Sequence, residues 1–332
     1  MKKLNFAGRA LAIILMLLTS WSATNPAESA TSAPKPVPLK LRIAYVAPIG
    51  VMAPVWMAAE AGAFKAEGLE VELIYIEARS AIAALVAKEV DVLEISAPGM
   101  IPASLAGADV TMIAGLLNKM IFSLHAQKEI KSAEQLRGRV VGTDRVGTPS
   151  DYGARVALTL LGLKPESDVQ LLRIGASAVL LPALQSGQIA AAAITPPQSV
   201  KADALGFSRL VNTYHLPYQN IGVVVRKAEI EPRSELWARL LRALREAIHR
   251  WYADAKLAKE VLRKYAKESD PEMLQKTYEF FTSQAGFNKE MVITDQGLQQ
   301  ILTFLGSTTL PSAKEAPPAR FYDTRILNSI GR

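Results

Sequence analysis

Cysteine is absent from the 332 residues of this chain. A chain without cysteine forms no disulfide, has no thiol nucleophile and binds no metal through sulfur. It also lacks the cysteine at which a bacterial lipoprotein is cleaved and acylated. Histidine is scarce as well: the three histidines, at positions 125, 215 and 249, share no metal-ligand spacing. We therefore expect no metal site.

Clustered charge and nucleotide-binding motifs are also missing. The net charge is +7, but the basic residues are scattered along the chain, which argues against nucleic acid as a partner. The sequence has no phosphate-binding loop, no dinucleotide fingerprint in the right context and no nucleophile-elbow motif. No cofactor is therefore expected, and no catalytic residue is assigned.

The N-terminus has the pattern of a secretory signal peptide. Three basic residues precede the apolar run "ALAIILMLL" at residues 10–18, which is too short to cross a bilayer of about 30 Å. A buried N-terminal helix is the alternative, but the proline-containing segment that follows has no apolar periodicity. We predict a cleaved signal peptide at residues 1–30, a flexible linker at 31–39 and a periplasmic mature protein without a lipid anchor.

An internal repeat of about 98 residues occupies the first part of the mature chain. The segment from Leu41 resembles that from Gly138, "VELIYIEARSA" at 71–81 resembles "VQLLRIGASAV" at 169–179, and "ALVAKEVDVLEISAP" at 84–98 resembles "ALQSGQIAAAAITPP" at 183–197. Three matches in the same order argue against chance similarity. The period is longer than that of solenoid repeats, so two lobes of similar build are predicted.

Strand and helix patterns alternate in each half of the repeat, which predicts an α/β fold with parallel strands and helical crossovers. Ligands of such sheets bind outside the carboxyl ends of the strands. The loops at those ends are "APIGVMAP", "EARS" and "SAPG" in the first half and "DRVGTPSD", "GAS" and "TPP" in the second. Two such lobes make a cleft, and the helical segments that follow are expected to pack around the first lobe.

Four segments carry a resemblance to a known family: "APVWMAAEAGAFKAEGLEVEL" at 53–73, "AALVAKEVDVLEIS" at 83–96, "SAEQLRGRVVGTDRVGTPSDYGARVAL" at 132–158 and "LPALQSGQIAAAAITPPQSVKADALGFSRL" at 181–210. The chain resembles the substrate-binding proteins of nitrate, taurine and aliphatic-sulfonate ABC importers, relatives of the yeast thiamine-pyrimidine synthase.

The resemblance implies a two-lobe type II periplasmic binding protein fold, in which each lobe is a mostly parallel sheet flanked by helices. It places lobe one at residues 40–120 plus 220–332 and lobe two at residues 124–216. The hinge crossings are expected near 118–127 and 214–223.

Side chains on the carboxyl-end loops are the candidates for ligand contact. Thr148, Pro149 and Asp151 suit the N-cap, first and third positions of a helix, and a helix start also offers free N–H groups to a ligand. Asp151 would compete with an anion there. The candidate ligand contacts are Gly50, Val51, Met52, Arg79, Ser96, Ala97, Arg145, Gly147, Thr148, Ser150, Thr195 and Pro196.

Several of these candidates have structural alternatives. Arg79 suits a carboxylate, sulfonate or phosphate, but it equally suits solvent. Arg145 has the same two alternatives and a potential partner in Asp144, and Met52 suits the core. The apolar residues of "APIGVMAP" depart from the more polar loop of anion binders in the family, which counts against sulfonate or nitrate as the ligand.

A solute-binding function is what the resemblance implies. The protein would capture a small organic molecule, sulfonate, carboxylate or pyrimidine-like, and deliver it as a monomer to an ABC permease in the inner membrane. A periplasmic sensor subunit that reports its ligand to a membrane receptor is the alternative. An enzyme on the same fold is disfavoured, because the thiamine-pyrimidine synthase carries a cysteine-rich segment and this chain has no cysteine.

Overall fold

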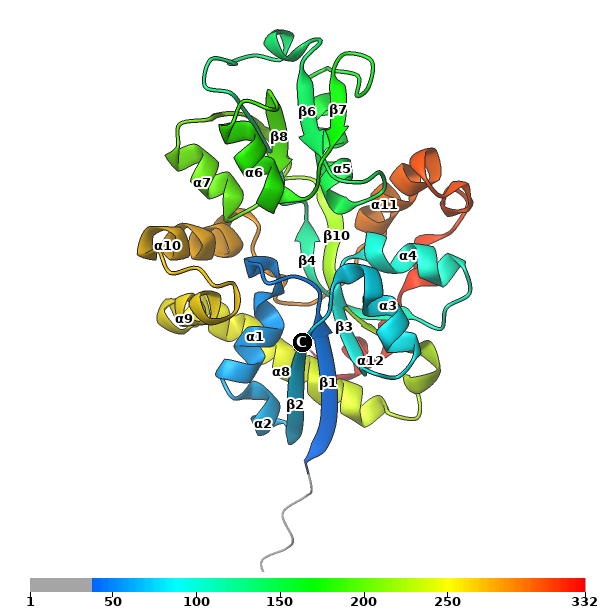
Figure 1. Cartoon of the computed structure of the whole chain (residues 1–332). Coiled ribbons are helices and arrows are strands. Elements are labelled where there is room, and N and C mark those ends of the chain that lie inside the picture. The colour runs from blue at the N-terminus through cyan, green and yellow to red at the C-terminus, as the bar shows by residue number, and fades with distance from the viewer. Residues whose placement is uncertain (1–37, 332) are drawn as a thin grey trace, which may run out of the picture. The chain divides into compact units, whose positions relative to one another are not determined.

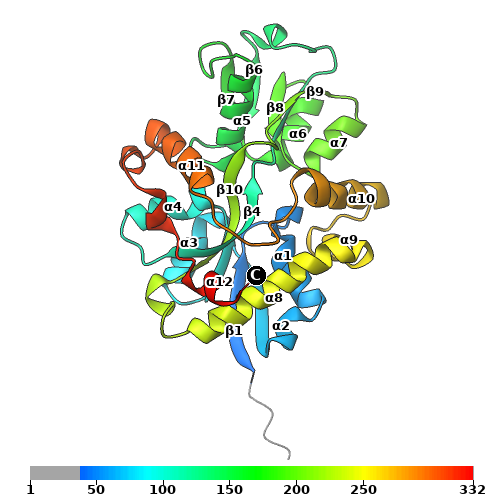
Figure 2. The same cartoon turned by 180° about the vertical axis from the view of Figure 1, so that it is seen from behind.

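The structure, a computed structural model, describes residues 38–331. The predicted signal peptide and most of the predicted linker lie outside the described residues. The described residues fold around two five-stranded mixed sheets, which Figures 1 and 2 show from opposite sides. None of their helices combines the length and the apolar character needed to cross a membrane.

The first sheet has four strands in one direction and one in the other. Strand β1 pairs in parallel with β2 and β3, whereas β10 is antiparallel to both β3 and β4. In spatial order its strands are β2 (Leu69–Tyr75), β1 (Leu39–Tyr45), β3 (Val92–Ile95), β10 (Pro217–Val225) and β4 (Thr111–Lys119).

The second sheet repeats this plan. Strand β6 pairs in parallel with β7 and β8, and β5 is antiparallel to both β8 and β9. In spatial order its strands are β7 (Gln170–Arg173), β6 (Val140–Thr143), β8 (Ala191–Ile194), β5 (Ser123–Ala126) and β9 (Ser208–Asn212).

The shared plan accounts for the internal repeat. Strands β1 to β4 correspond in order to β6 to β9, and each sheet receives one antiparallel strand from the other half of the chain. We call the part around the first sheet lobe one and the part around the second sheet lobe two. The predicted two-lobe α/β fold with mostly parallel sheets is confirmed. Consecutive strands change sheet between β4 and β5 and again between β9 and β10, and the predicted lobe boundaries remain predictions.

Helices flank both sheets. Lobe two carries α5 (Pro149–Leu160), α6 (Ser177–Gln185) and α7 (Gln198–Ala204). The other α-helices are α1 (Ala53–Glu60), α2 (Ala63–Ala66), α3 (Ala78–Val86), α4 (Ala97–Leu105), α8 (Ser234–Ala253), α9 (Ala255–Tyr265), α10 (Pro271–Glu279), α11 (Asp295–Thr308) and α12 (Arg325–Ser329). Among the helices that follow β10, α8 lies against α1, α11 lies against β10 and α12 lies against β4.

Short helical turns complete the chain. The 3-10 turns are η1 (Gly50–Met52), η2 (Glu134–Leu136), η3 (Lys227–Glu229), η5 (Pro311–Ala313) and η6 (Pro318–Phe321). A π-helix, η4 (Phe280–Gln284), continues directly from α10. Such insertions often occur at functional sites, and this one lies close to the first carboxyl-end loop.

The hydrophobic core is unevenly divided between the lobes. The main core contains Trp56, Trp237 and Trp251, all fully buried. A separate, smaller cluster in lobe two is formed by Leu180, Leu184 and neighbours on α6, β8 and α7, and it has no buried aromatic residue among the described residues. The three buried tryptophans therefore all lie outside this smaller cluster.

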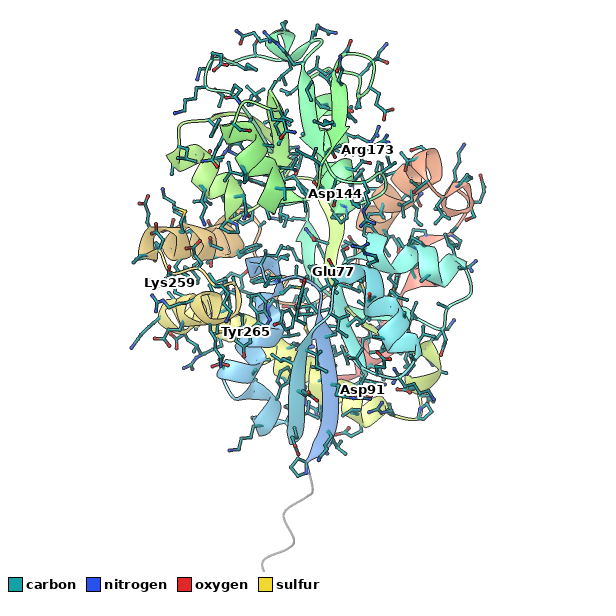
Figure 3. The ribbon with its side chains drawn as sticks, viewed as in Figure 1. Glu77, Asp91, Asp144, Arg173, Lys259 and Tyr265 are labelled. Carbon is teal, nitrogen blue, oxygen red and sulfur yellow. The ribbon has the colours of Figure 1, made fainter. Side chains whose placement is uncertain are left out.

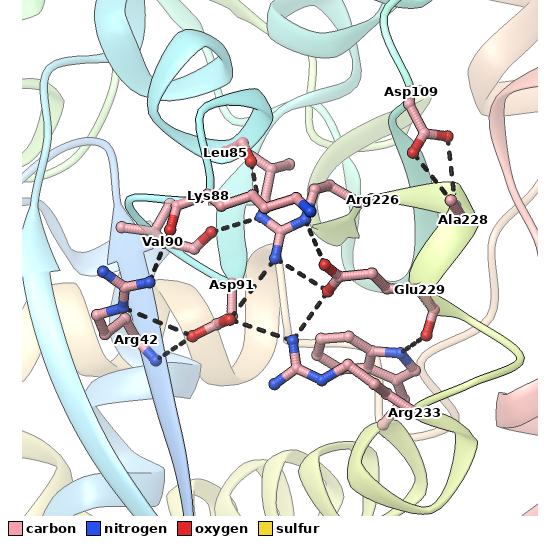
Figure 4. A network of polar contacts seen from close by, with 11 residues as sticks. Arg42, Leu85, Lys88, Val90, Asp91, Asp109, Arg226, Ala228, Glu229 and Arg233 are labelled. Carbon is pink, nitrogen blue, oxygen red and sulfur yellow. Dashed lines mark hydrogen bonds and ion pairs between the residues drawn. The ribbon is translucent and has the colours of Figure 1, made fainter.

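An ion-pair network fastens lobe one at the end opposite the carboxyl-end loops. Arg226, after β10, is 5% exposed, donates to two backbone carbonyls and pairs with Glu229 at 2.8 Å. Asp91, just before β3, lies 3.6 Å from Arg226 and 3.2 Å from Arg233 (Figure 4). The network ties the start of β3 to the end of β10 without involving the loops that carry the candidate site.

Candidate functional site

The first carboxyl-end loop of lobe one is buried against other parts of the protein. Val51 and Met52 are 3% and 2% exposed, and a Cβ atom added to Gly50 would come within 2.8 Å of the ring of Phe281 in η4. The three candidates Gly50, Val51 and Met52 thus seat the loop on the C-terminal helices. The structure places the side chains of Val51 and Met52 in the core.

The equivalent loop of lobe two is a hydrogen-bonded helix cap. Thr148 Oγ1 accepts the Asp151 N–H at 3.3 Å and donates to the Arg145 carbonyl at 2.8 Å. Asp151, fully buried, accepts the Gly147 N–H at 3.2 Å and pairs with Arg155 at 3.0 Å. The predicted N-cap at Thr148 is confirmed. The Asp151 carboxylate, however, bonds the residue before the cap and not the cap itself.

Gly147 has a conformational reason to be glycine. Its φ of +86° lies in the left-handed region, where a side chain is strained. A Cβ atom there would also lie 2.9 Å from Thr309 Oγ1, just beyond α11. The turn before α5 therefore lies against the end of α11.

Two hydroxyl groups beside this cap have no protein partner. Ser150, in the first turn of α5, is 6% exposed, and Thr143, the last residue of β6, is fully buried. Neither Ser150 Oγ nor Thr143 Oγ1 has a hydrogen-bond partner. Buried hydroxyls almost always have one, so this pair is a candidate for contact with a bound molecule.

A second pair of hydroxyls lies at the ends of the neighbouring strands. Ser177 Oγ and Thr195 Oγ1 are 3.3 Å apart, and the Thr195 N–H donates to Ser177 Oγ at 3.1 Å. Pro196, buried, follows Thr195 and precedes a cis peptide bond to Pro197. Ser177 and Thr143 were not among the sequence candidates, although Ser177 occupies the repeat position equivalent to that of Arg79.

In lobe one the corresponding strand end carries fewer hydroxyls. Ser96 is half-buried at the N-cap position of α4 and makes no side-chain capping bond, and Ala97 is fully buried. The polar contacts offered at the strand ends thus come mainly from lobe two.

Both candidate arginines are exposed and stand beside an acid. The Arg79 side chain is 70% exposed and 3.7 Å from Glu77, and the Arg145 side chain is 71% exposed and 3.9 Å from Asp144. Figure 3 labels Glu77 and Asp144 at the strand ends of the two sheets. The alternative in which Arg145 pairs with Asp144 agrees with this geometry.

A buried acid and an aromatic cluster lie behind the loops of lobe one. Glu94, on β3, is fully buried, and neither carboxyl oxygen has a partner with full hydrogen-bond geometry. Burial raises the pKa of Glu94 well above its usual value, against a smaller lowering by the Val55 N–H. Trp56 stacks on Tyr265 at 5.2 Å and meets the edge of Tyr45 at 5.4 Å.

A groove of about 860 Å³ runs along α5 and α11. At one end of the groove Tyr152 donates to Gln300 at 3.2 Å and stacks on Tyr218 of β10 at 5.3 Å, and burial raises the pKa of Tyr152 to about 12. None of the residues that line the groove has a buried polar atom without a partner. We therefore place the candidate site at the strand ends, where the unpartnered hydroxyls lie.

No group of three or more potential metal ligands occurs among the described residues. His125 is fully buried and its Nε2 lies 2.9 Å from Asp203, an arrangement that positions β5 against α7. The other two histidines take no part in a shared site.

Comparison with known proteins gives one family and one fold. A family model described as NMT1/THI5 like matches residues 50–258, more than half of the chain. No curated protein matches the chain.

Three solved structures illustrate the shared fold. The periplasmic aliphatic sulphonate binding protein SsuA from Escherichia coli is 19% identical, with a TM-score of 0.71 over 86% of this chain and 92% of that one. The alkanesulfonate-binding protein SsuA from Xanthomonas axonopodis, bound to MOPS, is 15% identical, with a TM-score of 0.66 over 88% and 98%. The periplasmic nitrate-binding protein NrtA from Synechocystis is 13% identical, with a TM-score of 0.67 over 88% of each chain.

Proposed function

We propose, on the premise that this chain belongs to the NMT1/THI5-like family, that it is a periplasmic solute-binding protein that delivers a small organic molecule to an ABC permease. Solved structures with this fold include periplasmic binding proteins for aliphatic sulfonates and nitrate. The fold supplies two lobes whose strand ends offer loops to a ligand, and closure of such lobes on a ligand is an established way to bind it.

The unpartnered hydroxyls of Thr143 and Ser150 carry this proposal. Each is buried at the end of β6 or in the first turn of α5 and has no partner within the protein. An unpaired buried hydroxyl costs stability, so its presence favours a role with a bound molecule. We retain Gly147, Thr148, Thr195 and Pro196 as proposed ligand contacts, together with Ser96, Ala97, Arg79 and Arg145.

The candidates Gly50, Val51 and Met52 are proposed to act differently. The side chains of Val51 and Met52 belong to the core and Gly50 has none, so any ligand contact would come from the backbone of the loop. Export by a cleaved signal peptide, a periplasmic location and a monomeric state complete the proposal. The mature N-terminus is expected after residue 22 and before about residue 38, which N-terminal sequencing of the periplasmic protein would test.

Replacement of the unpartnered hydroxyls tests the binding role. The solute is first identified by native mass spectrometry on protein purified from the periplasm without denaturation. Ser150→Ala and Thr143→Val each remove an unpaired polar atom, so we expect unchanged or slightly higher stability of the solute-free protein. We also expect at least fivefold weaker solute binding by calorimetric titration, about 1 kcal/mol.

The matched control is Ser186→Ala, which removes an exposed hydroxyl from the C-terminal end of α6, the end away from Ser177. It should change neither quantity. If Ser150→Ala and Thr143→Val bind the solute as tightly as the unmodified protein, the proposed site is wrong.

A further inference from the structure

An aromatic pair stands at the carboxyl ends of two neighbouring strands of lobe one. Tyr45 is the last residue of β1 and Tyr75 is the last residue of β2, and the parallel register of the two strands places them side by side. Their ring centroids are 5.8 Å apart, at an interplanar angle of 40°. This separation is typical of aromatic rings that attract each other. Both residues lie at the edge of the sheet at which ligands of α/β folds bind.

Tyr75 is the member of the pair that solvent reaches. It is 51% exposed and is the one aromatic residue among the exposed large apolar side chains of residues 38–331. Tyr45 is half-buried. Burial and the neighbouring Tyr75 raise the pKa of Tyr45 above its usual value, so its hydroxyl stays protonated at neutral pH. Covering aromatic surface with another apolar surface is favourable. The pair therefore presents an uncharged aromatic surface to a ligand.

Buried aromatic side chains hold the pair from behind. Trp56 in α1 is fully buried and meets the edge of Tyr45 at 5.4 Å. On its other side Trp56 stacks on Tyr265 of α9 at 5.2 Å (Figure 3), and the Tyr265 hydroxyl donates to Glu60 at 2.8 Å. Helices α1 and α9 thus fix the ring of Tyr45, against which Tyr75 lies. Side chains that are already ordered lose little conformational freedom when a ligand binds.

The internal repeat shows that the shared fold does not require these two rings. Tyr45 corresponds in the repeat to Gly142 of β6, and Tyr75 corresponds to Arg173 of β7. Gly142 is buried, and Arg173 lies 3.4 Å from Glu166. Lobe two therefore forms the equivalent strand ends without an aromatic pair at these positions. This difference favours a role for the tyrosines in binding over a role in the fold.

We propose that the solute carries an aromatic ring and that Tyr75, supported by Tyr45, is the residue that recognises this ring. The inference rests on the proposed solute-binding function and narrows the solute to ring-bearing molecules. It sets no condition on the charge of the solute, because a stacked ring is recognised by its face.

The test uses pairs of probes that differ only in the aromatic character of the ring. Benzamide is compared with cyclohexanecarboxamide, benzoate with cyclohexanecarboxylate, and benzenesulfonate with cyclohexanesulfonate, by calorimetric titration of the mature protein. We expect at least one aromatic probe to bind at least fivefold more tightly than its saturated partner, a difference of about 1 kcal/mol. If none of the three aromatic probes is preferred, the inference is wrong.

Two variants at one position separate the ring from the hydroxyl. Tyr75→Leu should abolish the preference for the aromatic probe, whereas Tyr75→Phe keeps the ring and should keep the preference. Tyr75 is exposed, so both variants should fold as the unmodified protein does. Tyr322→Leu is the matched control, because Tyr322 pairs with Met112 near the start of β4, away from the carboxyl ends of the strands. It should leave the preference unchanged, and a Tyr75→Leu variant that keeps the full preference would overturn the inference.

The solute identified by native mass spectrometry distinguishes this inference from the proposed function. We expect it to contain an aromatic ring and to bind at least fivefold more weakly to Tyr75→Leu. A solute without such a ring that loses affinity in Ser150→Ala would refute the inference and leave the proposed function standing. Failure of the proposed site appears separately, as unchanged solute affinity in Ser150→Ala and Thr143→Val.

Discussion

Gly50 and Gly147 occupy equivalent positions in the two halves of the repeat, but the protein supports them by different means. The loop at Gly50 is pressed against Phe281, Leu262 and Thr277 and is buried. The loop at Gly147 is a turn held by Asp151 and Thr148. Duplicated loops can thus keep their place at the strand ends while one is fixed by packing and the other by hydrogen bonds.

The same contrast extends to the strands behind the loops. Glu94 of β3 corresponds in the repeat to Ala193 of β8, and both are fully buried. Ser96 corresponds to Thr195. The Thr195 side chain forms a hydrogen bond with Ser177, whereas Ser96 makes no side-chain capping bond. At these positions lobe one has a buried acid and a serine without a side-chain hydrogen bond, whereas lobe two has a hydrogen-bonded hydroxyl pair.

Removal of the side chain that packs against the loop at Gly50 should have the largest effect on stability. Phe281 is fully buried and stacks on Phe287 at 5.3 Å. We expect Phe281→Ala to lower the free energy of unfolding by about 3–5 kcal/mol. Thr309→Ala, at the contact below the second loop, should change it by less than about 0.5 kcal/mol.

Urea denaturation of both variants would measure this difference. Losses of similar size in Phe281→Ala and Thr309→Ala would contradict the view that only the first loop depends on packing.

A smaller but still substantial loss of stability is expected in lobe two, where α5 packs against the start of β5. Gly153 in α5 is buried, and an added Cβ atom would lie 2.4 Å from the ring of Phe122, which immediately precedes β5. A glycine-to-alanine change inside a helix normally stabilises by about 0.5–1 kcal/mol. Here we expect Gly153→Ala to destabilise by about 1–3 kcal/mol, because the contact is overpacked.

A double-mutant cycle with Phe122→Leu sharpens this prediction. The smaller side chain should recover part of the loss, so that the two changes are not additive. Strict additivity, or a stabilising Gly153→Ala, would mean that the contact with Phe122 does not explain the glycine.

The buried acid of lobe one should make stability depend on pH. Burial raises the pKa of Glu94 above the value of 4.5 that it has when exposed. The folded protein therefore keeps a proton that the unfolded chain releases as the pH passes that value. The free energy of unfolding should fall as the pH rises, by up to about 1.4 kcal/mol per pH unit, until the folded carboxyl also ionises.

Glu94→Gln should remove this slope and become progressively more stable than the unmodified protein as the pH rises above 4.5, until the folded carboxyl of Glu94 ionises. Glu72→Gln, on the edge strand β2 and exposed, is the control. The comparison is made by denaturant unfolding across the pH range, and parallel curves for the Glu94→Gln and unmodified proteins would refute the prediction.

The sequence was sufficient where the determinants are local or repeated. Alternating strand and helix patterns and the repeat predict two α/β lobes, and the Thr148, Pro149 and Asp151 pattern predicts the start of α5. Burial of the loop at Gly50 could not be predicted, because Phe281 lies far along the chain and reaches the loop only through a π-helix.

The sequence predicts only some of the hydroxyl groups at the strand ends of lobe two, for a related reason. Ser150 and Thr195 were candidates because they follow strand ends. Thr143 lies inside a strand pattern, and Ser177 is paired to Thr195 only by the sheet order. A missing hydrogen-bond partner is a property of the three-dimensional neighbourhood, so no sequence pattern indicates it.

The smallest of these effects concerns the cap that distinguishes the two helix starts. Thr148 corresponds in the repeat to Val51, and α1 begins without a side-chain capping bond, whereas Thr148 caps α5 through the Asp151 N–H. Thr148→Val therefore makes the start of α5 resemble that of α1 and should cost about 1 kcal/mol of stability. Ser96→Ala should cost close to nothing, because Ser96 makes no capping bond. Thermal and urea unfolding of the two variants would measure the difference, and an equal cost at both positions would show that capping does not separate the lobes.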